Sequence, residues 1–286
     1  MEIFKKRDQL KSFLETSKKN NKKIGFVPTM GALHKGHLYL IEQAKKKNDI
    51  VVASIFVNPT QFNNQEDLDN YPKTLEKDIE LLKSVSCDVL FAPAVKEIYH
   101  ENIVSDKFDF DGLEHEMEGK FRAGHFDGVG TIVKELFEIV SPKNAYFGEK
   151  DFQQLQIIKK LVAKNKLPIS IKGCAIFREK DGLAMSSRNA RLTSEQRNAA
   201  PLIYKVLKNV KKKFQEETIE EISEWVENQF KNHPILQLAS RHDYDTFLRN
   251  QLLERKQFYY PPFVRLIEIT LKHKDSHKVQ SAAQLY

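Results

Sequence analysis

The chain has 286 residues, of which 41% are hydrophobic and 30% are charged, and its formal net charge is +7. This balance is typical of a folded protein of one or two domains and excludes a disordered or fibrous chain. The longest apolar run, residues 50–57, is too short to span a bilayer, and the start lacks a secretory signal, so we expect a cytoplasmic protein. Cys87 and Cys174 are expected to be reduced thiols. The positive charge is compatible with anionic substrates and does not require nucleic acid.

Short β-branched runs alternate with amphipathic stretches through the first part of the chain. Strands are expected at residues 23–27, 50–57, 88–91, 145–147 and 169–173. Helices are expected up to about residue 47 and at 74–84, 129–140 and 152–164. This alternation predicts an α/β fold with a parallel sheet, in which ligands bind at the carboxyl ends of the strands.

The pattern changes after about residue 178. Two helices are expected there, at 193–215 and 218–232, and Leu202, Val206 and Val210 share one face of the first.

The loop at 28–37 joins a strand to a helix and contains Gly31 and Gly36, which permit close approach to a ligand. His34 and His37 would lie on one face of the first helical turn, beside its positive end. This arrangement favours a phosphate site. The alternative is a pair of histidines that only cap or pack the helix, and a zinc site lacks a third ligand at a standard spacing.

A second strand-to-helix loop covers residues 147–154. Gly148 permits close approach, Lys150 offers a cation for phosphates, and Asp151 could cap the helix or bind a ribose hydroxyl. A capped surface helix explains these residues equally well.

Three other loops carry polar groups. In residues 181–189, Gly182 offers a hinge, and the serines beside Arg188 suit an anion clamp. Gln61, at the end of the second strand, can donate and accept hydrogen bonds to a hydroxy acid. His125 is expected to bond to backbone. The first loop together with the serine loop matches the two-part nucleotide site of adenylyl-transferring α/β proteins.

Six stretches resemble, in order and spacing, the pantothenate synthetase (pantoate–β-alanine ligase) family. They are residues 28–37, 54–62, 69–76, 122–129, 147–154 and 182–192, and the similarity extends from residue 1 to about 230. The resemblance implies a Rossmann-like nucleotidyltransferase domain followed by a smaller, incomplete α+β domain. It implies ATP-dependent condensation of pantoate with β-alanine through pantoyl adenylate, with release of AMP and pyrophosphate. Mg²⁺ is expected with ATP, with no ligand assigned, and the protein is expected to form a homodimer and to bind no membrane.

The resemblance also implies residue roles. Catalysis is expected at His37, as proton donor, with His34 and Lys150. Gln61 and Gln154 would bind pantoate, and Gln61 also β-alanine; the pantoate methyl groups would face Val129, Ile132 and Val133. The residues implied for ATP binding are Met30, Gly31, Ala32, Leu33, His34, Lys35, Gly36, His37, Gly148, Glu149, Lys150, Asp151, Phe177, Met185, Ser186, Ser187 and Arg188.

The end of the chain departs from this family. Residues 239–286 resemble a piece of the primosomal replication-restart helicase, so three parts are expected: a nucleotide- and pantoate-binding domain at 1–177, a partial lid domain at 178–238 and this tail. Turnover is expected to be reduced, because the serine loop would lack its usual support. The alternatives are another nucleotidyltransferase, such as a pantetheine-phosphate adenylyltransferase, a nucleic-acid-associated replication protein, and a folded but inactive chimera.

Overall fold

The structure, a computed structural model, describes residues 1–62, 68, 71–72, 74–99 and 103–231. The chain divides into two compact units, Met1–Arg197 and Asn198–Tyr286, which are described separately. The predicted tail at 239–286, and with it the helicase resemblance, lies outside the described residues. The predicted boundary after residue 177, between a nucleotide- and pantoate-binding domain and a lid domain, stays a prediction.

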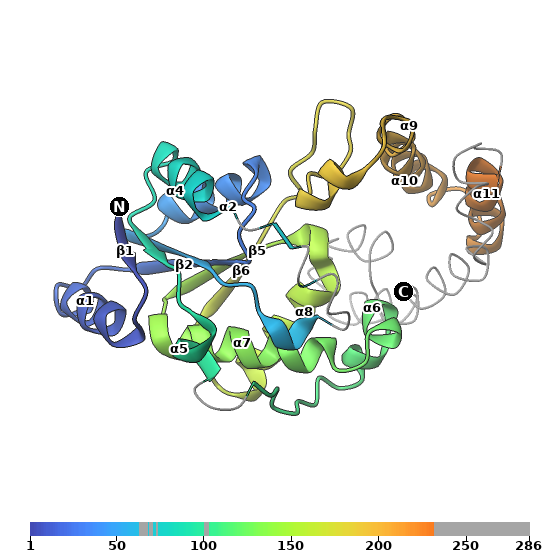
Figure 1. The fold of residues 1–286 in the computed structure, drawn as a ribbon. Helices are drawn as coiled ribbons and strands as arrows, with labels where there is room; N and C mark the ends of the chain where they lie inside the picture. Colours follow the sequence, from blue (N-terminus) through green and yellow to red (C-terminus); the bar gives the residue numbers. More distant parts are fainter. Residues whose placement is uncertain (63–67, 69–70, 73, 100–102, 232–286) are drawn as a thin grey trace, which may run out of the picture. The chain divides into compact units, whose positions relative to one another are not determined.

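The first unit is built on a parallel sheet of six described strands (Figure 1). The order across the sheet is β1-β4-β3-β2-β5-β6. Their bounds are β1 Glu2–Phe4, β2 Ile24–Thr29, β3 Ile50–Ile55, β4 Val89–Phe91, β5 Asn144–Gly148 and β6 Ser170–Cys174. The predicted α/β class and the five predicted strands are confirmed. The sequence pattern missed β1, because three residues are too few to show a strand period.

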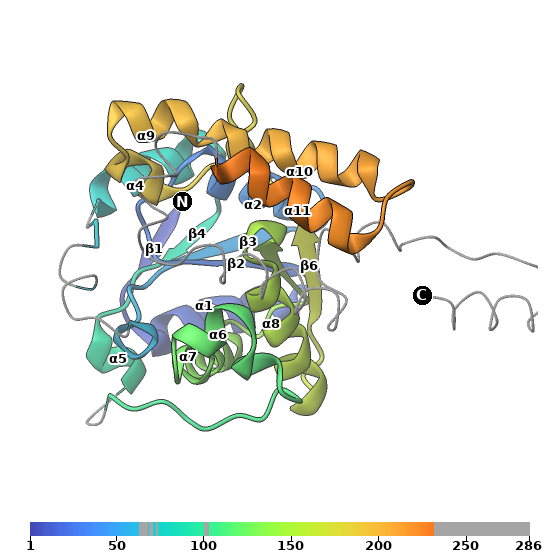
Figure 2. The ribbon, with the colours of Figure 1, turned by 90° about the vertical axis from the view of Figure 1, so that its right-hand side faces the viewer.

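Helices cover both faces of this sheet (Figures 1 and 2). One face carries α1 (Arg7–Lys19), α5 (Val95–Tyr99), α7 (His125–Val140) and α8 (Phe152–Lys164), and the other carries α2 (Lys35–Lys45) and α4 (Leu75–Ser84). The shorter elements are η1 Pro59–Gln61, η2 Leu113–His115, α6 Met117–Phe121, η3 Glu149–Asp151 and η4 Ser187–Arg191. Among the described residues, no helix is long and apolar enough to cross a membrane.

Successive residues of each central strand enter different cores. Phe26 and Val52 pack towards α7, whereas Val27 and Ala53 pack towards α2. Both sides of the strand are therefore buried, which explains its unbroken apolar sequence. Cys87 and Cys174 are free, buried thiols, as predicted. Burial raises the pKa of the Cys87 thiol to about 11 and also raises the pKa of Cys174, so neither is a reactive thiolate.

The second unit contains α10 (Pro201–Lys213) and α11 (Ile219–Lys231), whose apolar faces pack on each other through residues such as Val206 and Val226. The single helix predicted at 193–215 is wrong. It is two helices, α9 (Ser194–Ala199) and α10, because Pro201 lacks the backbone N–H that a continuous helix would use.

The position of β2 decides where a ligand can bind. Along the chain, β3 and β4 are added on one side of β2, and β5 and β6 on the other. The loops after β2 and β5 therefore leave adjacent strand ends in opposite directions and open a crevice between them.

Helix α7 approaches the loop after β3 very closely. A Cβ atom on Gly128 would lie 2.5 Å from the carbonyl oxygen of Thr60 and 2.9 Å from the backbone nitrogen of Gln61. Glycine at this position therefore sets how near η1 can sit to α7.

We predict that Gly128→Ala destabilises the protein by about 1–3 kcal/mol, because rigid backbone has to move away from the added methyl group. Urea unfolding measures this loss. Gly148→Ala is the matched control for stability, since the nearest atom to its Cβ is 4.0 Å away. Equal stability of the two variants would contradict the prediction.

Candidate active site

A cavity of about 260 Å³ opens at the carboxyl ends of β2, β3 and β5. Most of the residues predicted to bind substrates line it: Met30, His34, Gly36, His37, Gln61, Gly148, Lys150, Asp151, Gln154, Phe177, Met185, Ser186, Ser187 and Arg188. Five others are not among the lining residues: Gly31, Ala32, Leu33, Lys35 and Glu149. Gly31 and Leu33 are buried, and the Lys35 side chain is exposed.

His34 and His37 begin α2, and their rings stack with centroids 4.0 Å apart. His34 is the N-cap: its Nδ1 accepts a hydrogen bond from the Gly36 N–H at 3.1 Å. The Nδ1 of His37 accepts from the His34 N–H at 3.3 Å. The prediction that both rings share one face is confirmed, and the two interpretations of the pair are compatible, because rings that cap the helix also line the cavity.

These bonds determine the tautomer of each ring. A neutral imidazole whose Nδ1 accepts a hydrogen bond carries its proton on Nε2. The backbone thus occupies the acceptor nitrogens of His34 and His37 and leaves both Nε2–H groups as donors. Each ring can therefore donate to a phosphate oxygen without carrying a charge.

The pKa values of both rings favour the neutral form. Burial, with His34 and Lys150 nearby, lowers the pKa of His37 to about 3. Burial and then Lys150 lower the pKa of His34. The formal positive charge of the cavity wall therefore comes from Arg122, Lys150 and Arg188, not from the histidines.

Lys150 follows β5 and is exposed, with its Nζ 2.7 Å from Oδ1 of Asp151. Asp151 lies at the N-cap of α8 but makes no side-chain capping bond, so the capping role considered for it is wrong. Its carboxylate pairs with the lysine instead. This pair is exposed, so it contributes little to stability and can open when an anion arrives.

Hydrogen bonds within residues 177–189 hold this segment in a closed loop. Arg178 and Ala184 form a β-bridge, and the Met185 N–H donates to the Phe177 carbonyl at 3.0 Å. Asn189 Nδ2 donates to the Ala184 carbonyl at 3.1 Å. These bonds bring the Ser186 to Arg188 stretch and Phe177 to the same cavity wall.

Gln61 is oriented by a buried amide. Asn58, only 1% exposed, donates from Nδ2 to Gln61 Oε1 at 3.2 Å and to the Gly128 carbonyl at 3.1 Å. The oxygen of Asn58 accepts from the hydroxyls of Tyr99 and Thr60. Its Nε2 donates to the sulfur of Met30 at 2.9 Å, so each end of the Gln61 amide keeps one further hydrogen-bonding position for a ligand.

Arg122 and His125 also line the cavity and both bind the backbone carbonyl of Gln61, at 2.8 and 2.9 Å. The predicted backbone bond of His125 is confirmed. Since a carbonyl only accepts, His125 Nδ1 carries the proton, and Nε2 faces Arg122 Nη1 at 3.4 Å. Burial, and then Arg122, lower the pKa of His125. The sequence analysis did not predict Asn58, Arg122 or His125 as site residues, although His125 begins α7 directly after Gly124.

The two adjacent glutamines of α8 have different environments. Gln153 is buried, and its side chain binds the backbone of Leu113, Glu116 and Glu118. Gln154 lines the cavity. Also among the lining residues are the apolar Val129, Ile132 and Val133 of α7.

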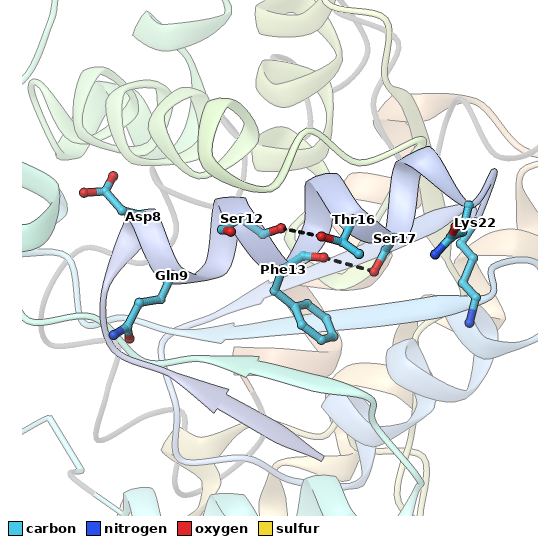
Figure 3. A pocket seen from close by; sticks show the side chains of 8 residues that line it. Asp8, Gln9, Ser12, Phe13, Thr16, Ser17 and Lys22 are labelled. Atoms are coloured by element: carbon cyan, nitrogen blue, oxygen red, sulfur yellow. Dashed lines mark hydrogen bonds between the residues drawn. The ribbon is translucent and has the colours of Figure 1, made fainter.

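In the described part of the chain, no group of three His, Cys, Asp or Glu side chains is arranged to hold a metal ion. A wider, shallow hollow of about 670 Å³ lies along α1 (Figure 3). Its Thr16 and Ser17 hydroxyls are bonded to carbonyls of the same helix, so these two donors are already satisfied.

Comparison with known proteins gives one consistent family. The sequence model of the family described as pantoate-beta-alanine ligase matches residues 2–273. Proteins named pantothenate synthetase from Christiangramia forsetii and Flavobacterium psychrophilum are each 54% identical over 239 residues. These matches cover 83% of this chain and 84% and 85% of the two relatives. The family match therefore extends into the region for which a helicase fragment was expected, and none of these comparisons shows that fragment.

Solved structures agree with the sequence comparisons. A pantothenate synthetase from Thermus thermophilus matches with a TM-score of 0.76 and 41% identity, over 82% of this chain and 83% of the other. A pantoate-beta-alanine ligase from Francisella tularensis, in complex with beta-gamma ATP and beta-alanine, has a TM-score of 0.70 and 41% identity. That match covers 80% of this chain and 86% of the other.

We predict that the protein loses stability as the pH is lowered below about 6.5, the ordinary pKa of histidine. The reason is that His37 has a lower pKa in the folded protein than in the unfolded chain. The unfolded chain then binds more protons than the native state, so stability rises with pH between about 3 and 6.5. His37 alone accounts for at most about 1.4 kcal/mol per pH unit.

Urea unfolding at pH 7.5, 6 and 5 tests this. His37→Gln should flatten the loss, whereas His115→Gln, which changes a side chain that is 80% exposed, should not. Parallel pH profiles for the wild-type chain and His37→Gln would refute the assignment.

Proposed function

The chain belongs to the pantoate-beta-alanine ligase family, and on this basis we propose how its cavity carries out the ligase reaction. The enzyme condenses pantoate with β-alanine at the expense of ATP, through pantoyl adenylate, and releases AMP and pyrophosphate. The observation that carries the proposal is the meeting of two Nε2–H donors at the start of α2 with Lys150 from the loop after β5, in one cavity.

ATP would occupy the part of the cavity between the two loops. His34 and His37 would donate hydrogen bonds to phosphate oxygens, with the N-terminus of α2 behind them. Lys150 and Arg188 would neutralise the α- and β-phosphates, and the segment from Met185 to Arg188 would close the site beside Phe177. Negative phosphates next to His37 favour its charged form, so a proton taken up there could pass to the departing pyrophosphate.

Pantoate would lie on the α7 side. Gln61 and Gln154 would bind its hydroxyl and carboxylate oxygens, while Val129, Ile132 and Val133 would contact its methyl groups. A pantoate carboxylate oxygen attacks the α-phosphorus, a new P–O bond forms, and the bond to the β-phosphate oxygen breaks. Held donors aimed at the developing charge lower this barrier without reorganisation.

The second step uses the same cavity. The β-alanine amine, placed beside Gln61, attacks the acyl carbon of pantoyl adenylate. The new C–N bond forms, the bond from that carbon to the AMP oxygen breaks, and the proton lost by the amine passes to water. Holding both reactants in one cavity replaces a slow bimolecular encounter with a reaction between neighbours.

We propose that Mg²⁺ enters bound to ATP. In the described residues no cluster of metal-ligating side chains offers a dedicated site, and Mg²⁺ in phosphate sites keeps much of its water and phosphate coordination. The homodimer, implied by the family resemblance, and the cytoplasmic location, expected from the short apolar runs and the cysteines, also stay proposals.

Substitution of the cationic and histidine groups tests the site. Both His37→Ala and Lys150→Ala should reduce pantoate-dependent pyrophosphate release by at least about 100-fold, because each removes a donor to the transferring phosphates. Lys160→Ala is the matched control, since Lys160 pairs with Asp111 on the surface. Wild-type rates in either site variant would overturn the proposed roles.

Product analysis separates the reaction from its alternative. ATP with pantoate should give pyrophosphate, and AMP with pantothenate should appear once β-alanine is added. Pyrophosphate release that requires a phosphorylated pantetheine instead would indicate the other nucleotidyltransferase.

A gel-shift assay at physiological salt tests the nucleic-acid hypothesis for residues 239–286.

We predict that this chain has a severalfold lower kcat than the same chain carrying a C-terminal segment from a close relative in place of residues 239–286. The prediction rests on the sequence alone, in which the family's usual ending was not found in residues 239–286. Equal kcat values in the pyrophosphate assay would show that the native tail is adequate.

A further inference from the structure

Asp78 is a buried carboxylate that the reaction described above does not use. It lies on α4, is 1% exposed, and is not one of the residues that line the cavity. Its Oδ1 accepts a hydrogen bond from the Leu33 N–H at 2.7 Å. Its Oδ2 accepts from the Ala32 N–H at 3.0 Å and from the Thr74 hydroxyl at 3.2 Å.

The segment that Asp78 binds has an unusual backbone. Gly31 has φ of +83° and Ala32 has φ of +49°, so two successive residues are left-handed as the chain turns from β2 into α2. The alanine adopts this conformation at a steric cost that glycine does not have. A turn of this kind persists only where its surroundings fix it.

The carboxylate also shapes the turn sterically. A Cβ atom on Gly31 would lie 3.2 Å from Asp78 Oδ2 and 3.1 Å from the side chain of Ile55. The turn therefore packs directly against the Asp78 side chain of α4. Figure 1 shows α2 and α4 over the same face of the sheet, which lets one helix support the start of the other.

We propose that Asp78 is a positioning residue for ATP: it fixes the turn at 31–33 and thereby places the two histidines that begin α2. The proposal rests on the proposed function, in which those histidines bind the phosphates. The turn directly precedes His34, whose cap and stacked neighbour depend on where the helix starts. A displacement of about 1 Å in such donors can reduce catalysis by about 100-fold.

Asp78→Asn tests the role with little change of shape. The amide keeps one acceptor and brings an N–H group against the donors that now face a carboxylate. The KM for ATP should rise at least tenfold and kcat should fall, while the KM for pantoate stays within twofold. Binding of ATP alone, measured by calorimetry, should weaken by a similar factor.

Asp88→Asn is the matched control. Asp88 also accepts a backbone N–H, from Val51 at 2.8 Å, and pairs with Lys45, but it lies at the amino ends of the strands. The Asp88→Asn substitution should change the melting temperature without changing the KM for ATP more than twofold. If Asp78→Asn does not fold, Thr74→Val removes one donor to the carboxylate and should raise the KM for ATP about twofold to fivefold.

Each result gives a decision. A selective loss of ATP binding in the Asp78 or Thr74 variant supports positioning. An unchanged KM for ATP, an equal rise in both KM values, or the same loss in Asp88→Asn would overturn it. Failure of the wild-type chain to release pyrophosphate from ATP and pantoate would instead contradict the proposed function, so the two failures are distinguishable.

Discussion

The site depends on one topological constraint, the reversal of strand order at β2. Because β3 and β5 flank the same strand, the loops after β2 and β5 open in opposite directions at adjacent strand ends. This brings the histidine pair and Lys150 to one cavity although more than a hundred residues separate them in the chain. The helices on the two faces of the sheet also contribute to the cavity: α7 supplies apolar lining residues, and α2 supplies its positively charged N-terminus.

Within the cavity, backbone bonds decide what each histidine can do. His34 and His37 accept backbone N–H groups on Nδ1 and so present Nε2–H donors, whereas His125 donates from Nδ1 to a carbonyl. Burial keeps all three pKa values low. In the proposed function, Lys150 and Arg188 would therefore supply the positive charge for the phosphates, and the imidazoles would enter the reaction as neutral donors.

Buried polar neighbours give these groups fixed directions. Asn58 holds the oxygen of Gln61, and Tyr99 and Thr60 hold Asn58 in turn. The Asp78 carboxylate serves the turn before α2 in a comparable way. In both places a satisfied, water-excluded network orients a side chain or backbone segment that could otherwise adopt several conformations.

The sequence by itself determined the α/β class, the main strands and helices, the shared face of His34 and His37, and the family. These follow from local periodicity, helical spacing and short motifs, which require no knowledge of distant contacts. Only the tertiary structure showed that Gln153 is buried while Gln154 lines the cavity, and that Asp151 does not cap α8. It also showed that Asn58, Arg122 and Asp78 contact the site loops. These outcomes depend on contacts between residues far apart in the chain, and a hydrogen bond between such residues leaves no period in either segment.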